Sequence, residues 1–174
     1  QTLNGAGTAS LNNVTVNGSS NTVSLNANYD VTGNLRVVSG TFAPSASDAY
    51  YNVDSLVVHS GGTFDGTNLT ATWLSGSFRN HGTLTSLADT TVFRASAAGL
   101  TVTGGPTFEN LRIIDSGRVT LVSNTTVTDE LQLVGGFLVT GSSSLILTKT
   151  ATDPVTGGDS LSFVDGNVVI TWPA

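Results

Sequence analysis

Leu11-Asn-Asn-Val14-Thr-Val16 opens the stretch that decides the fold, and it continues with Val23-Ser-Leu25, Val31-Thr-Gly-Asn-Leu35-Arg-Val37 and Gly40-Thr-Phe42. A second series echoes it with Phe108-Glu-Asn-Leu111-Arg-Ile113, Val119-Thr-Leu121, Val127-Thr-Asp-Glu-Leu131-Gln-Leu133 and Gly136-Phe-Leu138. The offset is 97 residues at the start (11 to 108) and 96 after one deletion near Ser20 (23 to 119). Short segments repeated at fixed spacing are typical of an elongated stack of similar units.

Each segment alternates apolar and polar side chains, so that Val14 and Val16, or Leu35 and Val37, share one face of a strand. Gly and Asn stand between the segments, where corners need a positive φ. No helical period longer than two turns is present. We expect strands at residues 13–16, 22–25, 34–38, 55–58, 68–73, 83–87, 90–93, 101–103, 110–113, 118–121, 130–133, 144–147, 160–164 and 167–171, with loops at 43–52 and 149–158.

Two all-β folds place inward-facing strands every 8–12 residues. One is a parallel β-solenoid (β-helix), and the other is an antiparallel β-sandwich. The turn motifs recur at intervals of about twenty residues and the connections do not have hairpin lengths, which favours the solenoid. We expect one domain over residues 1–174, with about eight coils and two related repeats at about 1–97 and 98–174.

Composition excludes several functional classes. Only 10% of the residues are charged and the net charge is −6, so the clustered cations that bind nucleic acid are missing. No apolar run approaches the ~20 residues of a membrane helix, so we expect no insertion into a membrane. The chain has no cysteine, which excludes disulfides and thiolate metal sites.

The sequence contains no pattern of catalytic residues. His59 and His81 have no Gly-Xaa-Ser-Xaa-Gly nucleophile near them. Acids are spread thinly and mostly flank Gly, Ser or Thr, as turn residues do, although Asp54 and Asp65 are candidates to face each other on one coil. The calcium-binding nonapeptide is absent. We predict no enzymatic activity, no cofactor and no metal.

Several motifs carry a family resemblance that spans nearly the whole chain: Gln1-Thr-Leu-Asn-Gly, Leu11-Asn-Asn-Val-Thr-Val, Val31-Thr-Gly-Asn-Leu, Val38-Ser-Gly-Thr, Thr91-Val-Phe-Arg-Ala-Ser, Phe108-Glu-Asn-Leu-Arg-Ile and Ser162-Phe-Val-Asp-Gly. They resemble large secreted or cell-surface repeat proteins of adhesin type from Bacteroidetes-like bacteria. The resemblance implies a parallel β-solenoid at the bacterial cell surface or outside the cell, and it brings no catalytic residues to transfer.

These observations lead to three functional hypotheses, of which the third, a polysaccharide-degrading enzyme, needs acidic or basic side chains that converge in a groove. The first is a non-catalytic structural unit of an extracellular fibre or surface adhesin, which associates head-to-tail with copies of itself through Leu3 and Val14 at one end and Val169, Ile170 and Trp172 at the other. Gln1–Leu11 aligns with Ala98–Phe108, so the sequence starts in mid-repeat; a fragment of a longer repeat protein would show the same feature. The second is a carbohydrate-binding module in which Tyr50 and Tyr51 contact surface glycans; Trp73 and Phe78 are predicted to be core.

Overall fold

The protein is an all-β stack in which every pairing between named strands is parallel. The structure, a computed structural model, describes residues 2–3, 8–25, 28–44, 49–96, 98–148 and 153–172, without the side chains of 2–3, 8–9, 28 and 49–51. The described residues form the strands β1 (Thr2–Leu3), β2 (Thr8–Leu11), β3 (Val14–Leu25), β4 (Asn28–Phe42), β5 (Ala49–Asp65), β6 (Leu69–Leu74), β7 (Phe78–Asn80), β8 (Thr83–Ser86), β9 (Thr90–Arg94), β10 (Leu100–Thr103), β11 (Thr107–Ile114), β12 (Arg118–Leu121), β13 (Thr125–Leu133), β14 (Phe137–Leu147), β15 (Val155–Gly157) and β16 (Val164–Ile170). This arrangement confirms the predicted parallel β-solenoid and excludes the antiparallel sandwich.

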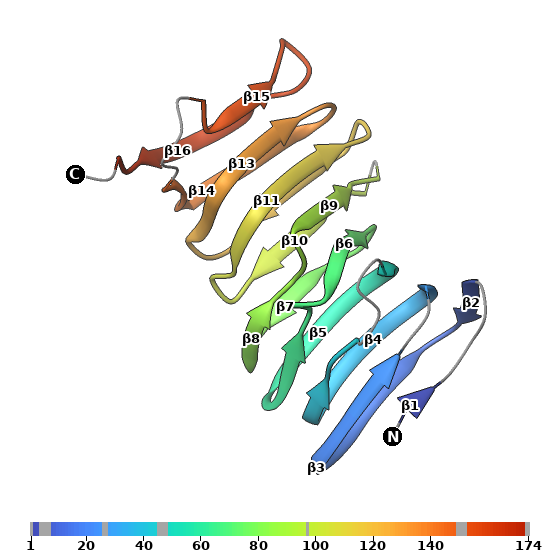
Figure 1. Ribbon diagram of the computed structural model, residues 1–174. Helices are drawn as coiled ribbons and strands as arrows, with labels where there is room; N and C mark the ends of the chain where they lie inside the picture. The colour runs from blue at the N-terminus through green and yellow to red at the C-terminus, as the bar shows by residue number, and fades with distance from the viewer. Residues whose placement is uncertain are drawn as a thin grey trace.

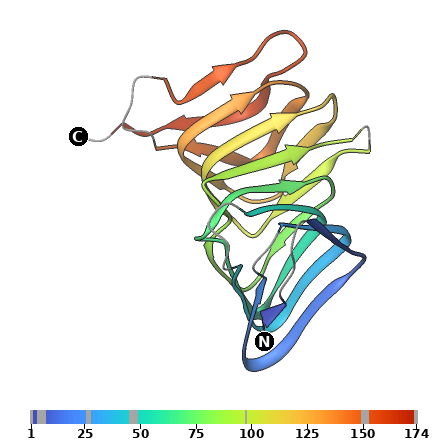
Figure 2. The same cartoon turned by 45° about the vertical axis from the view of Figure 1, so that its right-hand side comes forward.

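The coils stack into an elongated body with β1 and β16 at opposite ends (Figure 1). The strand arrows on the near side of the stack point the same way in Figure 2. There are about seven turns, one fewer than predicted. Successive turns take 19 residues, as from Leu100 to Val119, to 26 residues, as from Leu138 to Val164.

Each turn contributes to three ladders, which we name in the order in which the chain meets them from the start of β3 onward. The third face contains residues 28–31 of β4 and runs β2–β4–β5–β6–β9–β11–β13–β15. The first face contains residues 34–39 and runs β3–β4–β5–β7–β10–β12–β14–β16. The second face contains residues 41–42 and runs β3–β4–β5–β8 and, further along the stack, β11–β13–β14–β16. Long strands such as β4 therefore bend around the corners rather than ending there.

The core is made of columns in which one buried residue lies over another. On the first face, the column contains Leu35, Leu56, Phe78, Val102 and Leu121. On the third face, it contains Val31, Val53, Leu74, Phe93, Ile113 and Leu133. All of these side chains are buried, because a strand of period two sends every second residue inward and the next turn covers it.

The two sequence repeats keep their inward pattern but occupy different faces. Leu35 lies on the first face and its counterpart Leu131 on the third, and both are buried. Phe42, on the second face, has its counterpart Leu138 on the first. The offset of 96 residues between these counterparts is not a whole number of turns, so the second repeat is rotated by one face relative to the first.

Three local predictions were wrong. The segment 160–164 is mostly a turn closed by an antiparallel bridge between Asp159 and Ser162, and strand β16 begins only at its last residue. β5 already begins at Ala49, inside the predicted loop 43–52, and β15 lies inside the predicted loop 149–158. Backbone pairing to the neighbouring turn extends these strands beyond what local sequence indicates. Residues 45–48 and 149–152 lie outside the described residues.

Candidate functional site

The last turn of the solenoid leaves its inward side uncovered. Val168 and Ile170 lie directly over Leu145 and Leu147, which are 0% and 1% exposed. Val168 and Ile170 themselves are 42% and 48% exposed, because among the described residues β16 pairs with β14 alone. These two core columns therefore end in open apolar side chains at this end of the stack.

Register divides the predicted self-association residues at this end into two kinds. Ile170 continues an inward column, whereas Val169 lies over Ile146 on the outer side of the strand. Trp172 follows the strand and is exposed. The sequence reasoning missed Val168, which strict alternation places on the same side as Ile170. It also missed Val155, which lies over buried Leu131 on the third face.

The predicted contacts at the other end are Leu3 and Val14. Leu3 lies on β1, which pairs with the end of β3, and its side chain lies outside the described residues. Val14 begins the first-face ladder and packs, partly buried, against the core. The two sets of candidates lie at opposite ends of the stack (Figure 1), so contact between them requires two molecules.

The tyrosines predicted to contact glycans lie on the third face rather than on a loop. Tyr51 occupies a register position between Tyr29 and Thr72, and Tyr50 pairs with Ala71. Their side chains lie outside the described residues, and glycan contact through them stays a prediction.

A groove of about 290 Å³ lies on the outer surface where the third face turns into the first. Its lining includes Trp73, so the prediction that this residue belongs to the core was wrong, whereas Phe78 is fully buried as expected. Trp73 is half-buried, and its indole lies 5.5 Å from the guanidinium carbon of Arg94. Asp30, Asn52, Asp54 and Ser75 also line the groove.

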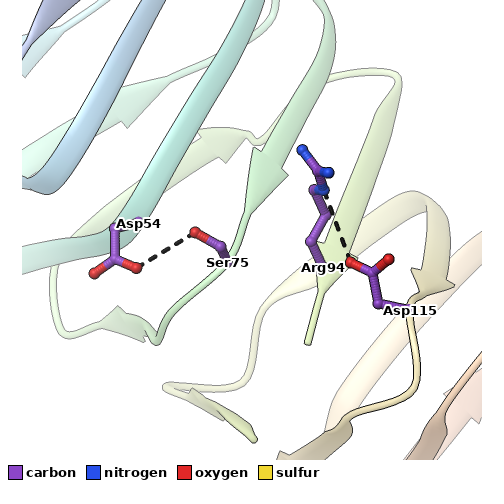
Figure 3. Close-up of polar contacts among 4 residues, drawn as sticks. All are labelled: Asp54, Ser75, Arg94 and Asp115. Atoms are coloured by element: carbon purple, nitrogen blue, oxygen red, sulfur yellow. Dashed lines mark hydrogen bonds and ion pairs between the residues drawn. The ribbon is translucent and has the colours of Figure 1, made fainter. Parts of the chain in front are cut away.

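The polar groups of this groove are held by short contacts between turns (Figure 3). The Ser75 hydroxyl donates to Asp54 Oδ1 at 3.3 Å, and Arg94 Nε lies 3.8 Å from Asp115 Oδ2. Asn52 Nδ2 donates to Asp30 Oδ1 one turn away. Both partners of the Arg94–Asp115 pair are about half exposed, at 50% and 52%, so water screens their attraction.

The structure does not bring the candidate acid and base residues into a catalytic arrangement. Asp54 lies between the third and first faces, whereas Asp65 ends the second-face part of β5 and accepts hydrogen bonds from Thr67, so the two do not face each other. His59 Nε2 lies 3.1 Å from Arg36 Nη2. Within the described ranges, no group of three or more His, Asp or Glu side chains is placed to hold a metal ion.

In the part of the chain that the structure describes, no helix is long and apolar enough to cross a membrane. Comparison of the chain with protein-family models, with curated proteins and with solved structures found no match in any of the three.

Proposed function

We propose that the protein is a non-catalytic structural unit of an extracellular bacterial fibre or surface adhesin, in which copies associate head-to-tail through their end coils. One observation carries the proposal: the uncovered inward side chains of the last turn. Val155, Val168 and Ile170 follow Leu131, Leu145 and Leu147 in their columns, and those three leucines are buried. Another coil laid on this end would bury Val155, Val168 and Ile170 in the same way.

The backbone supports the same arrangement. Among the described strands, β16 and β15 each pair on one side only, and β1 and β2 do the same at the opposite end. Unpaired strand edges are templates for further pairing, and proteins usually protect them with charged side chains. Residues 1–29 contain no charged side chain. One end can therefore lie on the other in parallel, a heterologous contact that extends rather than closes.

The bacterial and extracellular setting rests on the family resemblance of the sequence motifs. An adhesin of this kind gains length by stacking, since each solenoid turn needs only its neighbours for stability. A second copy is the occupant to which we commit.

Light scattering after size-exclusion chromatography, over a wide range of protein concentrations, tests the association. We expect the mass to rise with concentration, and electron microscopy to show rods longer than one molecule. A double variant Val168→Lys/Ile170→Lys adds charges to the open end and is expected to stay monomeric. Val122→Lys is the matched control, because Val122 is 58% exposed and lies away from the end turns.

A wild-type protein that stays monomeric at every concentration overturns the proposal. So does a double lysine variant that assembles as well as the Val122→Lys control, because the contact would then lie elsewhere. Circular dichroism of each variant confirms that the solenoid is still folded.

A further inference from the structure

The groove beside Trp73 lies on the side of the solenoid and plays no part in end-to-end stacking. It belongs to the outward column of the third face, where Asp30, Asn52 and Trp73 lie over one another on β4, β5 and β6. Successive rungs of a sheet lie ~4.8 Å apart, so these side chains line one continuous wall. Arg94 reaches the groove from β9, on the far side of β6.

Trp73 differs from most other aromatic residues of the protein in facing outward. Five of the seven phenylalanines, and the described tyrosine side chain of Tyr29, are buried in the core, whereas Trp73 faces outward and lines a hollow. The Arg94 guanidinium lies over the ring at 5.5 Å, and the half-buried indole also lines the groove. An aromatic surface held in place with polar groups around it is the usual composition of a small-molecule site.

Hydrogen-bonding groups surround the ring on two sides. Asp30 and Asp54 provide carboxylate acceptors. Asp30 accepts a hydrogen bond from Asn52, and Asp54 accepts one from Ser75 (Figure 3). The Arg94 guanidinium and the Asn52 amide are donors. A ligand that fits has one apolar face to stack on the indole and a rim of hydroxyl groups to meet these donors and acceptors. A pyranose ring has both, since its axial C–H groups form an apolar face and its hydroxyls lie around the edge.

Charge selects among sugars. The groove contains two carboxylates, Asp30 and Asp54, and one guanidinium that already faces Asp115. A uronic acid would meet net repulsion, whereas a neutral sugar gains the hydrogen bonds without that cost. A metal ion is a weaker candidate, because the described residues contain no group of three or more acids or histidines suited to one.

We propose that this groove is a binding site for a neutral saccharide, with one pyranose ring stacked on Trp73 and its hydroxyls bound by Asp54, Arg94 and the Asp30–Asn52 pair. The volume of about 290 Å³ suits one or two sugar rings, and the open outer surface leaves room for a longer chain. The inference is independent of the end-to-end association, which uses other residues.

The two tryptophans of the chain make a direct test possible. In the Trp172→Phe variant, Trp73 is the sole indole, so its fluorescence reports on the groove alone. The protein is titrated with neutral gluco-, manno- and chito-oligosaccharides, and at least one of them is expected to change this fluorescence saturably. Sugar concentrations up to about 10 mM are used, because a shallow open site binds weakly. Oligogalacturonate, which is acidic, is expected to give no saturable change.

Calorimetry on variants then locates the site. With the sugar that binds, Trp73→Ala and Asp54→Asn are each expected to weaken binding about tenfold or more. Gln132→Ala is the matched control, because Gln132 lies on the same outward column three turns away. Trp73→Phe retains a ring over the neighbouring Val92 and serves if the alanine variant fails to fold; it is expected to bind more weakly than wild type.

Binding of none of the neutral oligosaccharides overturns the proposal, as does equal or stronger binding of oligogalacturonate. A Trp73→Ala or Asp54→Asn variant that binds as tightly as Gln132→Ala also overturns it. Because the end-coil variants Val168→Lys and Ile170→Lys leave the groove intact, they are expected to bind sugar normally.

Discussion

Two buried threonines allow the contribution of a single hydrogen bond to be measured. Thr72 and Thr91 are neighbours in one inward column of the third face, and they are 0% and 1% exposed. The Thr72 hydroxyl donates to the carbonyl oxygen of Leu87 at 2.5 Å. The Thr91 hydroxyl has no partner among the described residues. Replacement of either threonine by valine keeps the shape of the side chain and exchanges its hydroxyl for a methyl group.

The two substitutions are expected to act in opposite directions. Thr72→Val removes a buried hydrogen bond and leaves the Leu87 carbonyl without this donor, which destabilises the protein by about 2 kcal/mol. Thr91→Val removes a buried hydroxyl that nothing satisfies, and the free energy of unfolding is expected to rise by about 1 kcal/mol. The difference between the variants, about 3 kcal/mol, corresponds to roughly 6–12 °C in melting temperature for a chain of this size.

Thermal and urea unfolding, followed by far-ultraviolet circular dichroism, measure both variants against wild type. The double variant is informative too, because the two residues are in contact through the ladder. Two valine variants with the same stability, or a Thr91→Val variant less stable than Thr72→Val, would falsify the assignment of the hydrogen bond.

Two further pairs of substitutions test packing and the corners. Phe108 is 1% exposed and its ring contacts two other buried phenylalanines, so Phe108→Ala is expected to lower the free energy of unfolding by about 4 kcal/mol. Phe137→Ala loses only a stacking contact on the outer surface and should lower it by about 1 kcal/mol. Equal losses in urea unfolding would contradict the inward placement of Phe108. Gly104→Ala would place a Cβ 1.9 Å from the Asn80 carbonyl oxygen at a φ of +98°, and is expected to lower the free energy of unfolding by more than about 3 kcal/mol. Gly141 has a φ of +57° and nothing within 4 Å of an added Cβ, so Gly141→Ala should lower it by about 1–2 kcal/mol. Melting temperatures in the reverse order would refute the close approach of the two turns at this corner.

Alternation predicted an all-β fold, and the spacing of the turn motifs favoured the solenoid over the sandwich. Pairs such as Leu35 and Val37 mark the inward side of a strand from sequence alone, and both are buried. Local pattern did not predict the extent of strands such as β5, because β5 is extended through its corners by pairing with β4 and β6 on neighbouring turns. Strand length in a solenoid is therefore decided by neighbouring turns as much as by local propensity.

The candidate sites show a similar division. The sequence pointed to the apolar C-terminal segment, but choosing Val169 in place of Val168 missed the alternation that register with β14 imposes. Trp73 was predicted to be core because large aromatic side chains are usually buried. Only the stacking of its strand on β5 shows that it shares an outward column with Asn52 and Asp30.

The order of residues by itself determined that short strands repeat, which side of each strand faces inward, and that glycines mark the corners, because these properties depend on side chains within a few residues of one another. The tertiary structure decided which face each strand occupies. Turn lengths vary from 19 to 26 residues, so the rotation accumulated along the chain cannot be read from any local pattern. That rotation places the second repeat one face away from the first. The pairing of neighbouring turns brings Arg94 over Trp73, and it leaves Val168 and Ile170 without a covering strand among the described residues.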